Sequence, residues 1–220
     1  MVPLDQTLRR FIASLVAALV GCASLQPGLA AGVAGDFDFY VLALSWSPSY
    51  CEIAGNPDAR QCDEASGFIV HGLWPQYENG YPENCSSRMD QWVSRATIES
   101  LRDIMPSGGL VGSEWRKHGL CSGLQQVEYF NLLREAYDKI AIPEAYRRPT
   151  QDRSLPPRSV ESAFINANPG LSSGSIAVTC KENALSEVRI CLTRDLKFRT
   201  CQEVNRDDCR ASRISIPAAD

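Results

Sequence analysis

The stretch FDFYVLALSW, residues 37–46, decides the fold class of this chain. It is rich in aromatic and branched apolar residues, which is typical of a long strand. GFIV, residues 67–70, predicts a second strand that ends at His71. SIAVTC, residues 175–180, and LSEVRICLT, residues 185–193, predict two further strands joined by a turn at residues 181–184.

Between these strands the apolar residues follow the spacing of helices. Residues 92–105 and 125–141 place apolar side chains near one helical face, and residues 159–170 form a third candidate helix that Pro169 stops. The Pro-rich residues 149–157 predict a surface loop. Strands on both sides of a helical middle predict an α+β fold, with a central, mostly antiparallel sheet and flanking helices. The composition, 44% hydrophobic and 22% charged, fits a single domain, which we place at residues 36–215.

The first thirty residues are typical of a secretory signal peptide. Arg9 and Arg10 precede the apolar residues 11–20, and small residues follow up to Ala30 or Ala34, where cleavage fits. A membrane anchor is the alternative, but the apolar run is too short to span a bilayer. Residues 19–22, LVGC, resemble the lipid-attachment box of bacterial lipoproteins, so lipid anchoring at Cys22 stays open. We expect a secreted or periplasmic protein with no transmembrane segment in its mature part.

Cysteine usage agrees with export. The chain has nine cysteines, and loss of Cys22 with the signal peptide leaves an even set, as expected for disulfides in an oxidising compartment. Many pairings of this set are possible, and spacing alone does not choose among them. No CxxC pair occurs, so we expect no structural zinc site.

The charge balance excludes a general polyanion binder. The full chain carries a net charge of −4, and without Asp5, Arg9 and Arg10 of the signal peptide it has 20 basic and 25 acidic residues, or −5. If the protein handles nucleic acid, it must do so at a local cationic site.

Only two histidines occur, and each lies in an unusual segment. His118 belongs to EWRKHGLC, residues 114–121. If residues 113–120 form a short helix that Gly119 ends, then Glu114, Lys117 and His118 share one helical face. Glu114 and the helix C-terminus would then favour the imidazolium form of His118, while Lys117 would oppose it.

The other histidine, His71, belongs to FIVHGLWPQ, residues 68–76. Gly72 leaves room beside it, and Trp74 adds a rigid aromatic surface. One neutral and one protonated imidazole can serve as general base and general acid, and a lysine can stabilise charge on a phosphate. An exposed tryptophan can stack on a base. Together these groups suit attack by a ribose 2'-hydroxyl on its own phosphodiester, which needs no metal because the substrate contains the nucleophile.

Simpler interpretations of these segments remain open. A histidine after a strand can be a structural residue, and EWRKHG can be a helix end with a Glu–Lys pair. Zinc bound by both histidines and Glu114 would be repelled by Lys117.

Both histidine segments closely resemble the two active-site segments of the ribonuclease T2 family, the secreted acid ribonucleases of low base specificity. Residues 38–51, DFYVLALSWSPSYC, and the cysteine layout near the C-terminus are also similar, so the resemblance covers nearly all of the mature chain. It implies a monomeric endoribonuclease without cofactor or metal, whose substrate is single-stranded RNA and not DNA. The expected products are a 2',3'-cyclic phosphate and then a 3'-phosphate, with little base specificity.

The resemblance also implies a role for each catalytic residue. His118 would be the general base on the 2'-hydroxyl, and His71 the general acid to the 5'-oxygen. Lys117 and Glu114 would contact the phosphate in its transition state. Many family members have a histidine where this chain has Ser113, and we expect this difference to weaken substrate binding more than chemistry.

At the base site the resemblance implies that Trp74 stacks on the base, that Tyr81 forms the other wall, and that Gln76 offers an amide to the base edge. The implied disulfides are Cys85–Cys121, Cys51–Cys62, Cys180–Cys209 and Cys191–Cys201. Two other function classes stay in view: a non-enzymatic secreted protein that uses the same fold for recognition or storage, and a disulfide-stabilised hydrolase that uses a serine. Replacement of either histidine would favour the former, and both are present.

Overall fold

The computed structural model describes residues 32–54, 61–62, 67–82, 85 and 87–219. The expected signal peptide, residues 1–30, and Cys22 lie outside this part of the chain. Among the described residues, no helix combines the length and the apolar character that crossing a membrane requires.

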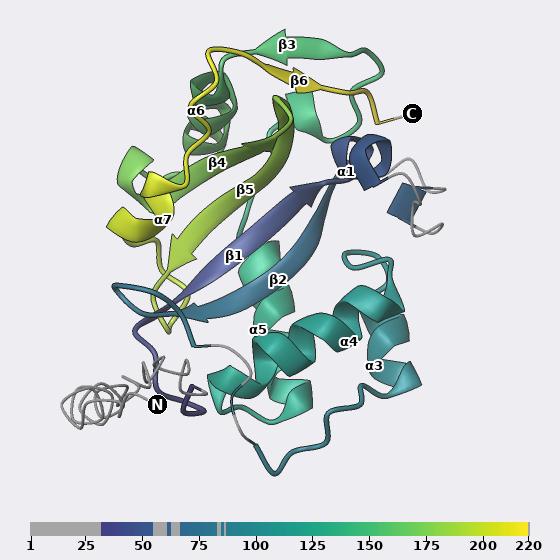
Figure 1. Cartoon of the computed structure of the whole chain (residues 1–220), viewed down its shortest axis with the longest axis vertical. Helices are drawn as coiled ribbons and strands as arrows, with labels where there is room; N and C mark the ends of the chain where they lie inside the picture. Colours follow the sequence, from purple (N-terminus) through teal and green to yellow (C-terminus); the bar gives the residue numbers. More distant parts are fainter. Residues whose placement is uncertain (1–31, 55–60, 63–66, 83–84, 86, 220) are drawn as a thin grey trace, which may run out of the picture. The chain divides into compact units, whose positions relative to one another are not determined.

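Six strands of the described chain form one sheet, in the order β2-β1-β5-β6-β3, with β4 also paired to β5 (Figure 1). The strand pairs are antiparallel except β5 with β6, which is parallel. The bounds are β1 Phe39–Trp46, β2 Phe68–Gln76, β3 Arg153–Leu155, β4 Ile176–Lys181, β5 Ala184–Leu192 and β6 Ile214–Ile216.

The helices pack against two parts of this sheet. Helices α4 and α5 contact β2, and α5 also contacts β1, whereas α6 and α7 contact β4 (Figure 1). The bounds are α1 Ser47–Ala54, α3 Arg95–Ser100, α4 Gly108–Lys117, α5 Gln126–Asp138, α6 Pro157–Ala167 and α7 Gln202–Arg206, with short 3-10 helices η1 Gly119–Ser122, η2 Glu144–Tyr146 and η3 Ser173–Ser175. The predicted α+β class with a mostly antiparallel sheet is confirmed.

Several predicted elements differ from the observed ones. The helix expected over residues 92–105 is only α3, because Ser94 caps it by accepting a hydrogen bond from Thr97 N at 3.1 Å. The loop expected over residues 149–157 contains β3, which pairs with β6, and its Pro157 begins α6. The strand expected to end at His71 continues to Gln76. Pro75 is tolerated there because β2 is an edge strand, so a residue without an N–H group need not break a hydrogen bond to a neighbouring strand.

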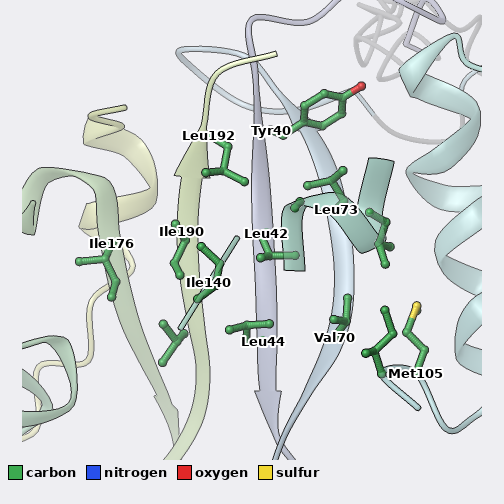
Figure 2. Packing of buried hydrophobic residues seen from close by; sticks show 14 of the residues in the cluster. Tyr40, Leu42, Leu44, Val70, Leu73, Met105, Ile140, Ile176, Ile190 and Leu192 are labelled. Atoms are coloured by element: carbon green, nitrogen blue, oxygen red, sulfur yellow. The ribbon is translucent and has the colours of Figure 1, made fainter. Parts of the chain in front are cut away.

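The core depends on the alternation of β1. Tyr40, Leu42, Leu44 and Trp46 face the main core together with apolar residues of β2 and β5, and Figure 2 shows several of these side chains along the three strands. Phe39 and Val41 face the opposite side and join a smaller buried cluster. Both faces of β1 are therefore covered. A fully buried leucine such as Leu42 contributes about 2 kcal/mol through its removal from water.

Candidate active site

A β-bulge in β2 places the first histidine. Leu44 of β1 pairs with Val70, and the next pair joins Ala43 to Gly72, so His71 is an extra residue in β2 without a partner in β1. The bulge shifts the alternation of side chains. Val70 and Leu73 both enter the main core, although they are three residues apart, while His71 and Trp74 are only partly buried and their rings lie 5.3 Å apart.

Gly72 leaves space for a carboxylate. A Cβ atom added at Gly72 would lie 2.2 Å from Glu114 Oε2 and 2.4 Å from Trp74 Nε1. Only glycine therefore lets the Glu114 side chain approach β2 this closely. The expected role of Gly72, to leave room beside His71, extends to Glu114 and Trp74.

Helix α4 places the second histidine. It begins five residues before the expected Ser113, after the cap Ser107, and ends at Lys117, so His118 is the C-cap and donates its backbone N–H to Glu114 O at 2.9 Å. Gly119 starts η1, and a Cβ atom there would lie 2.3 Å from the Trp115 ring. Gly119 is thus required by the packing of Trp115. The expected proximity of Glu114 and His118 is present, with Oε2 and Nε2 4.0 Å apart.

The Glu114 carboxylate lies at the centre of the site. Its Oε1 is 3.6 Å from His71 Nε2, and its Oε2 accepts a hydrogen bond from Trp74 Nε1 at 2.7 Å. Burial raises the pKa of Glu114 more than the charges of His71 and Lys117 and the Trp74 hydrogen bond lower it. The carboxylate joins both histidines and the tryptophan in one cluster.

The two histidines have opposite pKa shifts. Burial lowers the pKa of His118 to about 3, helped by the positive charges of Lys117 and His71. Among the described residues, the buried Nδ1 of His118 has no hydrogen-bond partner. Lys117 opposes the imidazolium of His118 as expected, and burial outweighs any support for it from Glu114 and the helix C-terminus. Desolvation dominates because only 5% of the residue is exposed.

His71 is more exposed, with 36% of its side chain accessible. Its partial burial lowers the pKa, but the hydrogen bond of Nδ1 with Glu187 Oε1 and the charges of Glu187 and Glu114 outweigh burial and raise it. His118 is thus held neutral while His71 favours the protonated form. This is the combination that a base and an acid need at the same pH.

A pocket of about 270 Å³ lies beside this cluster. Its lining includes the three expected base-site residues, Trp74, Gln76 and Tyr81, together with Lys117 and His118. Trp74 stacks on His118 with ring centroids 5.3 Å apart and planes 29° apart. Gln76 is buried, whereas Tyr81 is 52% exposed. The structure thus brings the expected base-site residues next to the expected general base.

His71 lines a different pocket, whose lining residues do not overlap with those of the first. Ser113, which we expect to weaken substrate binding, also lines this second pocket, with Tyr50 and Ser107. Ser113 is exposed and belongs to α4, one residue before Glu114.

Sequence reasoning missed two residues of β5, Glu187 and Arg189. Glu187 contacts His71, and Arg189 lines the first pocket with its guanidinium carbon 5.3 Å from the centre of the Trp74 ring. The available signal was a charged pair two residues apart within the otherwise apolar LSEVRICL. It shows that one face of this strand is polar, but not what that face contacts.

GLSSG, residues 170–174, has the GxSxG spacing of a serine nucleophile elbow. An elbow requires a turn from a strand into a helix, but this segment connects α6 to β4 through the 3-10 helix η3. Ser172 Oγ instead shares a hydrogen bond with Ser175 Oγ at 2.9 Å. The segment does not support a serine hydrolase.

Four disulfides link the described cysteines in the pairs that the resemblance implies: Cys51–Cys62, Cys85–Cys121, Cys180–Cys209 and Cys191–Cys201. Cys121 lies in η1, three residues after His118, so its bridge to Cys85 ties the end of α4 to the segment that follows Tyr81. Within the part of the chain that the structure describes, no three His, Cys, Asp or Glu side chains are arranged to hold a metal ion.

Known proteins resemble this chain over most of its length. Residues 37–201 match the ribonuclease T2 family. A ribonuclease of Aeromonas hydrophila is 37% identical over 171 residues, 76% of this chain and 76% of the relative. Ribonuclease I of Escherichia coli (strain K12) is 26% identical over 206 residues, 73% of this chain and 77% of the relative.

Solved structures share the fold. An RNase-related protein from Calystegia sepium has a TM-score of 0.66 at 26% identity, over 84% of this chain and 98% of that protein. RNase NT in complex with 5'-AMP has a TM-score of 0.58 at 24% identity, over 83% and 99%. With the family match over most of its length, this chain belongs to the ribonuclease T2 family.

Proposed function

We propose that this enzyme of the ribonuclease T2 family cleaves single-stranded RNA without a metal ion and with little base specificity. The reaction is transesterification by the ribose 2'-hydroxyl to a 2',3'-cyclic phosphate, followed by hydrolysis to a 3'-phosphate. The observation that carries the proposal is the pair of histidines with opposite pKa shifts on two sides of the Glu114 carboxylate.

In the first step, neutral His118 takes the proton of the 2'-hydroxyl as its oxygen attacks phosphorus. Protonated His71 gives a proton to the 5'-oxygen as the P–O5' bond breaks. Lys117, which lines the same pocket as His118, stabilises the negative charge that grows on the phosphoryl oxygens. In the second step the roles reverse, and water attacks the cyclic phosphate.

Glu114 acts as the common neighbour of both histidines. Its position 3.6 Å from His71 Nε2 keeps a carboxylate beside the proton that is to be transferred, and its hydrogen bond to Trp74 fixes the indole. Glu114 therefore keeps the acid and the indole in fixed positions while the phosphate reacts.

The base that precedes the cleaved bond is proposed to enter the pocket lined by Trp74, Gln76 and Tyr81. Aromatic surfaces accept every base, because each base presents a π-face. Gln76 is the one amide in this set. An amide can donate and accept, so it matches more than one base edge. These features favour low base specificity.

The test uses a DNA oligonucleotide that contains a single ribonucleotide, with an all-DNA oligonucleotide as its control, in buffer with EDTA. We expect cleavage only on the 3' side of the ribonucleotide, with a 2',3'-cyclic phosphate detected by mass spectrometry, because the 2'-hydroxyl is the nucleophile. His118→Phe should lower kcat by about three decades, since general acid–base terms are typically worth 10² to 10⁴ each. Loss of activity in EDTA with recovery on adding zinc, or equal cleavage of all-DNA, would contradict the proposal.

We also propose that the protein is exported and works as a monomer, with residues 36–215 as the catalytic domain. The four disulfides support export because such bonds persist in oxidising compartments. N-terminal sequencing of the mature protein would distinguish cleavage after Ala30 or Ala34 from lipid attachment at Cys22.

A further inference from the structure

A buried carboxylate lies behind His71, on the side away from Glu114. Glu187 of β5 is 6% exposed, and its Oε1 forms a short hydrogen bond with His71 Nδ1. The two ring nitrogens of His71 therefore each face a carboxylate, Nε2 that of Glu114 and Nδ1 that of Glu187. The mechanism described so far gives Glu187 no role.

The contact depends on small residues in the strand between them. His71 is on β2 and Glu187 is on β5, and these strands do not pair with each other because β1 lies between them. Glu187 pairs with Ser45 of β1, and the β1 residue next to the bulge is Ala43. Because both β1 side chains are small, the imidazole and the carboxylate can meet above this strand.

The second oxygen of the Glu187 carboxylate accepts a hydrogen bond from an arginine. Arg189 Nε donates to Glu187 Oε2 at 2.9 Å, and its Nη1 donates to Asp207 Oδ2, also at 2.9 Å. Oε1 is thereby left to His71. Burial raises the pKa of Glu187, but the hydrogen bond and charge of His71, together with Arg189, outweigh it and lower the pKa, so the carboxylate stays charged.

We propose that Glu187 is the positioning residue of the general acid. It accepts the Nδ1–H hydrogen bond of His71 and so leaves the Nε2 proton, on the Glu114 side of the ring, as the one to be transferred. A histidine whose Nδ1–H is held by a carboxylate is fixed in tautomer and in ring orientation. During cleavage the Nε2 proton passes to the 5'-oxygen as the P–O5' bond breaks, and Glu187 keeps its charge and takes up no proton. The inference rests on the proposed role of His71 as the acid.

The test is Glu187→Gln, which keeps the size of the side chain and an oxygen acceptor but removes the charge. We expect kcat for a dinucleotide substrate to fall about 10- to 100-fold, with little change in KM, by analogy with the loss of the hydrogen-bond partner of a metal-bound histidine. The basic limb of the pH profile should move to lower pH, because an imidazolium without this carboxylate loses its proton more readily. As the control, Glu99→Gln removes a carboxylate charge from an exposed ion pair with Arg102. It should leave kcat and the basic limb of the pH profile unchanged.

A second substrate separates positioning from a structural effect. A nucleoside 3'-(4-nitrophenyl phosphate) loses an acidic phenol, which departs without protonation and so does not need the general acid. Glu187→Gln should cleave this substrate at close to the parental rate. Glu187→Asp, which keeps the charge, should retain the basic limb of the parent with RNA.

The inference would be overturned if Glu187→Gln lost the same factor in kcat on both substrates. It would also be overturned if this variant kept the rate and the basic limb of the parent with RNA. His71→Ala distinguishes its failure from that of the proposed function. If His71→Ala cleaves RNA as fast as the parent, His71 is not the acid and the proposed function itself fails. If His71→Ala is impaired while Glu187→Gln is not, only the role of Glu187 is refuted.

Discussion

Replacement of His118 by Phe should make the protein less sensitive to acid. The phenyl ring keeps an aromatic surface against Trp74 but cannot bind a proton, and the buried Nδ1 that it replaces has no hydrogen bond to lose among the described residues. In the parent, His118 has a pKa of about 3 when folded and an ordinary pKa of 6.5 when unfolded. The unfolded state therefore gains a proton that the folded state does not.

The sign and size of the effect follow from this difference. Above the unfolded-state pKa of His118, neither state binds the proton and stability is unaffected. Between the unfolded-state and folded-state pKa values only the unfolded state binds it, so the free energy of unfolding falls as the pH decreases. Below the folded-state pKa the loss is complete. At pH 4 the solution is about 2.5 units below the unfolded pKa, and at 1.36 kcal/mol per unit this corresponds to about 3 kcal/mol. Between pH 7 and pH 4 the parent should lose about 3 kcal/mol more unfolding free energy than His118→Phe.

The assay is equilibrium unfolding in guanidinium chloride, followed by circular dichroism with the disulfides intact, at pH 7 and pH 4 for both proteins. Comparing the parent with the variant cancels the other groups that titrate in this range. Equal losses of unfolding free energy in the two proteins would refute the conclusion that His118 is held neutral, and with it the basis for assigning it as the general base.

Two further predictions concern the same helix. Lys117→Met should lower the maximum rate of RNA cleavage and move the acidic limb of the pH profile to higher pH, because the lysine charge helps to lower the pKa of His118; an unmoved limb in a full pH profile would exclude this electrostatic role. Replacing both Cys85 and Cys121 by Ala should reduce activity at temperatures where circular dichroism still shows a folded protein, since their bridge ties η1, next to His118, to the chain near the base pocket. Parallel loss of activity and secondary structure on heating would instead indicate a purely structural bridge.

The fold class could be predicted from the sequence, and so could the proximity of the two segments that contain the histidines. Helical spacing in EWRKHGLC brings Glu114 near His118, as expected, because residues four apart in a helix are neighbours. The start of α4 was not predictable, since the segment contains Gly108, Gly109 and Gly112, which are poor helix formers. Burial of α4 residues such as Trp115 outweighs this weak propensity.

The contact between His71 and Glu187 could not be read from the sequence. It depends on the register of two strands that are separated by a third, and on a bulge whose position no local pattern marks. The size of the pKa shift of His118 could not be predicted from the sequence either, because it depends on how deeply the helix end is buried. Local spacing captured the neighbours of each residue within its own segment, whereas desolvation and contacts across the sheet are set by tertiary packing.

Because of the bulge in β2, the residue at position 71 does not take part in the pairing of β2 with β1. His71 is the residue that strand pairing leaves out, while Val70 and Leu73 on its two sides supply the core. Its identity is therefore uncoupled from the register and from the apolar pattern that the fold requires. A lineage with this scaffold can exchange the residue at position 71 without shifting the strand register, but the buried carboxylates of Glu114 and Glu187 then lose the neighbour that their charges face.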